Sequence, residues 1–137
     1  MILVDTGPLI ALFDPADADH ASCVRLLATI DEPICTTIPV LTEAFHLLGP
    51  ASLGSLRLMD FIKARGLEVR FLDEADLARA FELIARHADH PMDLADASLV
   101  VMAERYRLRK IFTLNRSDFT TYCIRQGHRQ LDFTILA

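Results

Sequence analysis

Several features that define other classes of protein are missing from this sequence of 137 residues. No apolar run reaches the ~20 residues that a helix needs to cross a bilayer. The first ten residues, "MILVDTGPLI", carry no basic segment and meet Asp5 early, so we expect no signal peptide. Internal repeats, low-complexity segments and linkers are also absent. We therefore predict one globular domain over residues 1–137.

Cysteine is scarce and follows no ligand pattern. Cys23, Cys35 and Cys123 are odd in number and far apart, without the paired spacing of a metal site. We interpret them as reduced thiols that pack in the interior of a cytoplasmic protein.

The chain also lacks an overall excess of positive charge. Its net charge is −5, which taken alone argues against a nucleic-acid partner. The distribution is uneven, however, because residues 105–129 carry only one acidic residue, Asp118. One end of the protein could therefore attract phosphate, although an ordinary solvated basic face explains the same pattern. The basic residues of this segment are Arg105, Arg107, Arg109, Lys110, Arg116, Arg125 and Arg129.

What the sequence does contain is an alternation of strand-like and helix-like segments. The connections between strands are long enough for helical crossovers, which is typical of a parallel sheet. We predict an α/β fold with a central, mainly parallel sheet of four to five strands and helices on both faces. Catalytic acids should then lie beyond the carboxyl ends of the strands. The predicted strands are 1–5, 33–37, 67–72, 110–114 and 130–136, and the predicted helices are 8–14, 20–30, 39–49, 55–66, 73–89 and a helix after Pro91.

The segment 91–103, "PMDLADASLVVMA", places two acids at the start of an otherwise apolar helix. Asp93 and Asp96 are three residues apart and share a helix face. They could form a capping box, which accounts for their position. It does not account for two neighbouring negative charges with no Lys or Arg in the segment, because like charges in a buried setting destabilise the fold unless a cation compensates.

Two further acids are predicted at the same edge of the sheet. Asp5 closes the first strand, where it could also cap the following helix. Glu43 lies among apolar residues of the helix 39–49, where His46 could be its partner. Beyond the strand 110–114 come Asn115 and Asp118.

Taken together, these oxygen-bearing side chains predict a cation site. Carboxylate oxygens suit Mg²⁺ or Mn²⁺ rather than zinc, and no His or Cys cluster offers an alternative. Hard divalent cations held by carboxylates are a means of phosphodiester hydrolysis. Arg116, in the turn after the strand 110–114, is the basic residue that we expect to meet the phosphate.

Four stretches of the sequence resemble the PIN-domain family of ribonucleases, especially the VapC-type toxins of VapBC toxin–antitoxin pairs. They are "ILVDTGPLIALFDPADADH", "TTIPVLTEAFHLL", "MDLADASLVVMAERY" and "IFTLNRSDF". They cover nearly the whole chain in the family's order: an acid at a strand end, a helical Glu, a D-x-x-D-A helix and a T-x-[DN]-x-x-D-F turn.

The resemblance implies roles for individual residues. Asp5, Glu43 and Asp96 match the family's metal-binding catalytic acids, and Asp93 matches an additional acid one turn before the third. Thr6 matches the small hydroxyl beside the first acid and is expected to contact substrate. The chain departs from the family at Asn115, where the family often has Asp; either this residue or the nearby Asp118 is then the fourth metal ligand.

The resemblance also implies a function. It predicts a ribonuclease that uses Mg²⁺ or Mn²⁺ to cleave single-stranded RNA, a homodimer, and inhibition by a small antitoxin protein, with no membrane association. Two alternatives stay open on the same fold: a non-catalytic RNA- or protein-binding module whose metal site is partly degraded, and a housekeeping RNA-processing nuclease. A phospho-receiver domain has a similar length but needs an acidic pair after the first strand, where this chain has Thr6 and Gly7.

Overall fold

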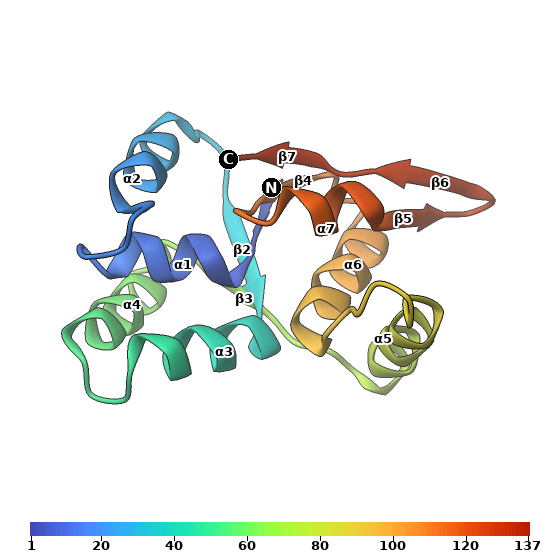
Figure 1. Cartoon of the computed structure of the whole chain (residues 1–137), viewed down its shortest axis with the longest axis horizontal. Coiled ribbons are helices and arrows are strands. Elements are labelled where there is room, and N and C mark those ends of the chain that lie inside the picture. The colour runs from blue at the N-terminus through green and yellow to red at the C-terminus, as the bar shows by residue number, and fades with distance from the viewer.

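The computed structural model describes residues 1–137 and has a five-stranded parallel sheet at its centre. The strand order is β3-β2-β1-β4-β7, and every neighbouring pair is parallel. Figure 1 shows the arrangement of the strands and helices. A separate two-stranded antiparallel hairpin, β5–β6, projects from one side. The strands are β1 (Ile2–Val4), β2 (Ile34–Thr37), β3 (Glu68–Arg70), β4 (Lys110–Phe112), β5 (Cys123–Gln126), β6 (Arg129–Asp132) and β7 (Thr134–Leu136).

Helices form a group on either side of the strands. Helices α1 to α4 pack on one another in one group, while α5 packs on α6 in the other. Strands β1 and β2 are buried along their whole length because both faces of the sheet are covered. The helices are α1 (Thr6–Phe13), α2 (His20–Thr29), α3 (Ile38–Leu48), α4 (Leu53–Lys63), α5 (Glu74–Arg86), α6 (Leu94–Tyr106) and α7 (Arg116–Thr121).

Helix α6 is the most deeply buried helix of the fold. The positions from Ala97 to Ala103 are all buried, on every face of the helix. Their small and aliphatic side chains allow α5, β2 and β5 to approach α6 from different directions. A helix apolar all round belongs inside a core, so only its first turn, with Asp96, is free to reach the sheet edge.

The predicted α/β class, with a mainly parallel sheet between helices, is confirmed. Each predicted helix is present with ends shifted by a few residues, and the turn after 110–114 contains the short helix α7. The predicted strand 67–72 is shorter, at Glu68–Arg70.

The prediction of one edge strand over 130–136 was wrong. Residues Arg129–Asp132 pair with β5 in the hairpin, and Thr134–Leu136 joins the sheet beside β4. The chain divides at Phe133, which turns inward and stacks edge-on against Phe119 at 5.4 Å between ring centroids. The sequence signal that could have found the hairpin is Gly127. Tight hairpin turns need a positive φ, which glycine adopts readily, and Gly127 has φ +62°.

Two expectations about the chain as a whole concern cysteine and membranes. All three cysteines are free, and Cys23 and Cys35 lie in the core as predicted. None of the helices is long and apolar enough to span a membrane.

Candidate active site

An open cleft of about 480 Å³ lies beyond the carboxyl ends of β1, β2 and β4. All six candidate oxygen ligands border it, and no Lys or Arg does. The cleft therefore gathers acids from four separate parts of the chain without a basic side chain between them. These residues are Asp5, Glu43, Asp93, Asp96, Asn115 and Asp118.

Asp5 is held rigidly at the base of the cleft. One carboxylate oxygen accepts a hydrogen bond from the Thr6 backbone N–H at 2.8 Å, which caps helix α1, and the other accepts one from the Thr113 hydroxyl at 2.8 Å. The side chain is 8% exposed. Burial raises the pKa of Asp5 above its usual value, and the nearby Glu43 and Asp93 add to the rise. The capping interpretation is thus correct, but capping uses only one of the two oxygens.

Glu43 and Asp93 approach the cleft from α3 and from the start of α6. Glu43 is half-buried, and its carboxylate forms no ion pair with His46, so the alternative of a Glu–His pair is not borne out. Asp93 is exposed and is the N-cap of α6, accepting a hydrogen bond from the Asp96 backbone N–H at 2.8 Å.

Asp96 is the second acid of the cleft whose pKa is raised by burial. Burial raises its pKa to about 7, and repulsion from Asp93 and Asp5 contributes in the same direction. Its side chain accepts a hydrogen bond from the Tyr122 hydroxyl at 3.2 Å. It does not bond back to the Asp93 backbone, so the capping box is only half formed. The Asp96 carboxylate therefore remains turned toward the cleft.

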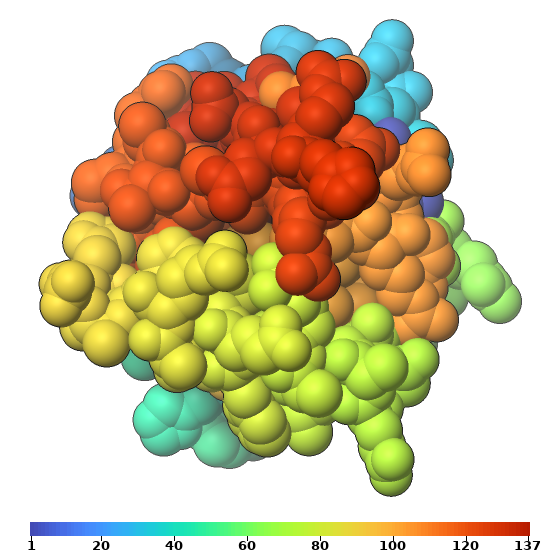
Figure 2. All heavy atoms as spheres, turned by 90° about the vertical axis from the view of Figure 1, so that its right-hand side faces the viewer, coloured from blue at the N-terminus to red at the C-terminus, as the bar shows by residue number.

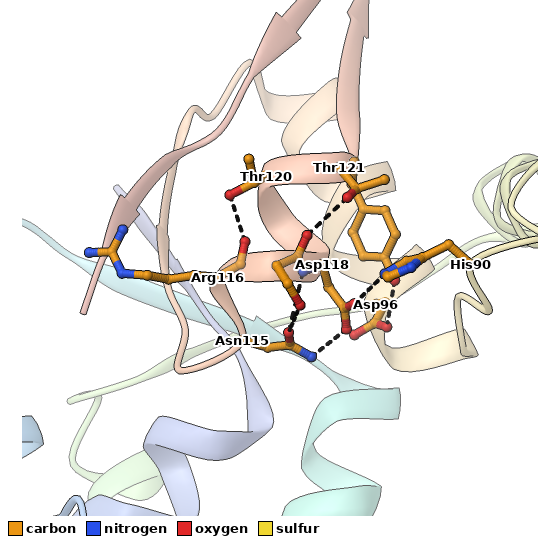
Figure 3. Close-up of polar contacts among 9 residues, drawn as sticks. His90, Asp96, Asn115, Arg116, Asp118, Thr120 and Thr121 are labelled. Atoms are coloured by element: carbon orange, nitrogen blue, oxygen red, sulfur yellow. Dashed lines mark hydrogen bonds and ion pairs between the residues drawn. The ribbon is translucent and has the colours of Figure 1, made fainter.

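The turn after β4 contributes a hydrogen-bonded pair, shown in Figure 3. The Asn115 amide nitrogen donates to one oxygen of Asp118, and the other oxygen contacts His90 Nε2 at 2.5 Å. Asn115 also caps α7 by accepting from the Asp118 backbone N–H at 3.3 Å. Asp118 therefore contacts two side-chain nitrogens, whereas no Lys, Arg or His side chain contacts Asp5, Glu43 or Asp96.

The two predicted substrate-binding residues are placed differently. Thr6 is buried at the cleft, and its hydroxyl has no hydrogen-bond partner. Arg116 follows Asn115 directly, but its side chain extends away from Asp96 and Asp118 in Figure 3 and does not border the cleft.

The basic segment 105–129 does not form one continuous surface. Arg105 pairs with Asp76 at 2.5 Å, and Lys110 pairs with Glu32 at 2.6 Å. Lys110 begins β4, so it lies at the amino edge of the sheet, opposite the cleft. Arg125 lies in β5, beyond the end of α7, whereas Arg116 is the first residue of that helix.

Three residues that support the acids were not found from the sequence. Thr113 orients Asp5, Tyr122 bonds Asp96, and His90 bonds Asp118. Thr113 is part of the T-x-[DN] pattern and was within reach of sequence reasoning. Tyr122 and His90 come from segments brought together only by folding, and no local spacing marks them.

The donor chemistry of the cleft fits a hard divalent cation. The side chains offer carboxylate and amide oxygens, and the buried Thr6 hydroxyl is still without a partner. No three His, Cys, Asp or Glu side chains are placed to hold one ion together. This suits Mg²⁺, which commonly takes one or two carboxylates and keeps water and phosphate oxygens as its other ligands. It does not suit zinc, which needs three or four protein ligands.

Comparison with known proteins identifies the class. The sequence matches the PIN domain family over residues 2–123, so the chain belongs to that family. It is 29% identical over 124 residues to Ribonuclease VapC26 of Mycobacterium tuberculosis, covering 87% of this chain and 90% of that protein.

Solved structures of toxins share the fold. The crystal structure of VapC20 of Mycobacterium tuberculosis, described as a Sarcin-Ricin loop cleaving toxin, superposes with a TM-score of 0.75 at 22% identity, covering 81% of this chain and 87% of that one. A toxin–antitoxin complex from Klebsiella pneumoniae gives 0.68 at 18% identity, covering 88% and 92%. VapBC2 from Rickettsia felis, bound to a DNA fragment from its promoter, gives 0.65 at 16% identity over the full length of both chains.

Proposed function

We propose that this protein is a metal-dependent endoribonuclease that cleaves single-stranded RNA and acts as the toxin of a toxin–antitoxin pair. The observation that carries the proposal is the acidic cleft: carboxylates from the ends of β1 and β4 and from α3 and α6 border one cavity that contains no Lys or Arg. Such an arrangement is electrostatically costly in a fold that does not bind a cation. The named ribonuclease relative supports RNA as the substrate.

Mg²⁺ or Mn²⁺ would be held by Asp5, Glu43 and Asp96, one or two of them binding directly and the rest through water, with Asp93 nearby. When bound, such an ion activates a water molecule and stabilises negative charge on a phosphodiester. Asp118 has a different role in this proposal, because its oxygens contact the side-chain nitrogens of His90 and Asn115, whereas those of Asp5 and Asp96 accept only from hydroxyl and backbone N–H groups. It anchors the turn after β4 beside the cleft rather than binding the first ion.

The chain's own residues prepare the cleft for this chemistry. Thr113 and the Thr6 backbone fix the two Asp5 oxygens, so the carboxylate need not reorganise on binding. The Tyr122 hydroxyl holds Asp96 in place from the interior. The unpartnered Thr6 hydroxyl is available to donate a hydrogen bond to a phosphate oxygen.

The proposal includes two protein partners. The antitoxin is supported by the toxin–antitoxin complexes that share this fold. A second copy of the chain is supported by an open groove that Ile38 and Leu94 border at the starts of α3 and α6, where both are about two-fifths exposed. Phe71, 68% exposed, lies beside it because Arg70 pairs in register with Thr37. Light scattering of wild type and Ile38→Asp tests the dimer, which the variant should weaken.

The nuclease activity is tested with purified protein, single-stranded RNA and either Mg²⁺ or EDTA. We expect cleavage with Mg²⁺, none with EDTA, and none from Asp5→Asn in either condition. Binding of RNA without cleavage by wild type in Mg²⁺ and in Mn²⁺ would show a degraded site instead. A short antitoxin-sized reading frame next to the gene would favour the toxin over a housekeeping nuclease.

A further inference from the structure

A second concave site lies outside the acidic cleft, on the other side of Tyr122. We propose that it binds a backbone phosphate of the RNA, one to a few nucleotides away from the phosphate that is cleaved. The inference rests on the proposed nuclease function and adds to it a separate phosphate subsite with its own residues.

The site is a pocket of about 100 Å³ between the end of α5 and the β5–β6 hairpin. Figure 2 faces this side of the molecule and shows the end of α5, in yellow, directly against the hairpin, in red. A volume of this size accommodates a group equal to a few waters at ~30 Å³ each, such as a phosphate. Its polar lining comes from four elements or their ends: Arg79, Arg86, His87, Thr121, Arg125 and Gln130.

Two of the three arginines at this pocket have no acidic partner. Arg79 is held by Glu104 at 2.9 Å and by Glu82 at 3.1 Å. Arg86 and Arg125 form no ion pair with any carboxylate. Glu104 is already engaged, because besides Arg79 it accepts a hydrogen bond from the Arg125 backbone N–H at 2.8 Å.

This arrangement leaves two exposed arginines without an acidic partner at the edge of one concavity. Like charges in one pocket repel each other unless an anion lies between them. Guanidinium groups present several N–H donors in a plane and bind phosphate in a bidentate manner. The Glu104 contacts fix the backbone of β5 against α5, so the pocket is built before any ligand arrives.

The pocket and the acidic cleft are close neighbours. The His87 ring packs edge-on against Tyr122 at 5.2 Å between centroids, and the Tyr122 hydroxyl bonds Asp96 in the cleft. Thr121, at the end of α7, borders the pocket, while Asn115, just before α7, borders the cleft. A helix of six residues is only about 9 Å long, so an RNA strand that runs along α7 meets both sites.

RNA is the ligand that this geometry favours over an acidic peptide. The protein is acidic overall and its cleft is negative, so a polyanion needs attraction from beside the cleft. Arg109 and Lys110 cannot supply it, because they lie at the start of β4, at the amino edge of the sheet, and Lys110 is paired with Glu32 there. The α5–hairpin pocket brings two basic groups without an ion-pair partner into one concavity near the cleft, whereas Arg116 stands alone and extends away from Asp96 and Asp118.

The test compares Arg86→Gln and Arg125→Gln with Arg25→Gln, which removes an exposed, unpaired charge from α2 on the other side of the fold. Binding of a fluorescent single-stranded RNA of mixed sequence is followed by anisotropy in EDTA over a salt series. We expect each pocket variant to bind ~3–10-fold more weakly and to reduce the salt slope by ~0.7, the value for one phosphate contact on a single strand. Arg25→Gln should match wild type.

A length series separates this subsite from a general loss of structure. With Mg²⁺, the pocket variants should raise KM for long RNA while leaving kcat unchanged, and should match wild type on a dinucleotide that fills only the cleft. Equal RNA affinity in wild type and both pocket variants, with wild-type cleavage intact, would overturn the subsite and leave the nuclease proposal standing. If wild type neither binds nor cleaves RNA, both proposals fail.

Discussion

Helices α5 and α6 begin with the same pattern, Asp-x-x-Asp, and use it differently. In α5, Asp73 and Asp76 form a complete capping box, and Asp76 also pairs with Arg105 at 2.5 Å. In α6, Asp93 caps the helix, but Asp96 makes no return bond and has no cation beside it. The hydrogen bond from the Asp76 backbone N–H lowers the pKa of Asp73, whereas burial raises that of Asp96 to about 7.

The difference lies in what the rest of the fold supplies. Arg105, in the last turn of α6, neutralises the α5 acids, so that pair is complete within the chain. The α6 acids face Asp5 and Glu43 across the cleft, where the fold adds negative charge instead. The same Asp-x-x-Asp pattern thus only caps the helix in α5, whereas in α6 it also contributes acids to a candidate metal site. Four predictions test this comparison.

The largest expected effect is on cleavage. Asp96→Asn should reduce cleavage with Mg²⁺ by at least ~100-fold, because even partners that only orient metal ligands are worth ~10–100-fold. Asp76→Asn, the matched change in α5, should leave the rate per folded molecule unchanged. Single-turnover cleavage of a labelled RNA measures both, and equal losses in the two variants would remove the functional distinction between the helices.

The second effect is on stability and concerns the acids of α5 instead of those of α6. Arg105→Gln should lower Tm by several degrees, because it leaves the Asp76 side chain, which is 10% exposed in the wild-type fold, without a cation. Arg57→Gln, an exposed arginine of α4 that forms no ion pair, is the control. Calorimetric melting in EDTA measures the change. If Arg105→Gln and Arg57→Gln have the same Tm, the ion pair between Arg105 and Asp76 does not stabilise the fold.

The third prediction concerns pH in the absence of metal. The folded protein holds a proton on Asp96 up to a pKa of about 7, whereas the unfolded chain releases it near 3.8. The folded state therefore loses stability relative to the unfolded chain as pH rises from about 4 to about 7.

Asp96→Asn removes this loss. In EDTA its Tm should exceed that of wild type by several degrees at pH 8, and the difference should shrink toward pH 4. Mg²⁺ should raise the Tm of wild type at pH 8 through preferential binding to the folded state. A variant that melts below wild type at pH 8 would instead favour a purely structural role for Asp96.

The smallest expected effect is at Asn115. Replacement by Asp adds a charge beside the cleft, so Asn115→Asp should strengthen Mg²⁺ binding in the absence of RNA by ~3–10-fold. It also removes the amide that donates to Asp118, which should lower Tm in EDTA. Asp118→Ala should weaken cleavage strongly only if Asp118 is a substitute ligand. Calorimetric titration of Mg²⁺ measures the affinity, and identical values in wild type and Asn115→Asp would place position 115 outside the metal's reach.

The order of strands and helices followed from the sequence because hydrophobic periodicity, prolines and glycines mark each element locally. The hairpin was missed because β5 and β6 are short and because 130–136 reads as one alternating stretch. Only the inward turn of Phe133 against Phe119 divides it. Boundaries of this kind depend on packing, which a local pattern does not contain.

The sequence by itself determined the fold class and the set of acids, because residues that follow parallel strands must meet at the same sheet edge. Tertiary structure alone decided which side chain each acid contacts. Arg105 reaches Asp76 from another helix, His90 reaches Asp118 across 28 positions, and Tyr122 reaches Asp96 across 26. The basic segment 105–129 was likewise divided by folding between opposite edges of the sheet. A sequence gives the number of charged residues. The attraction between charges depends on their distance and burial, and only the folded chain sets these.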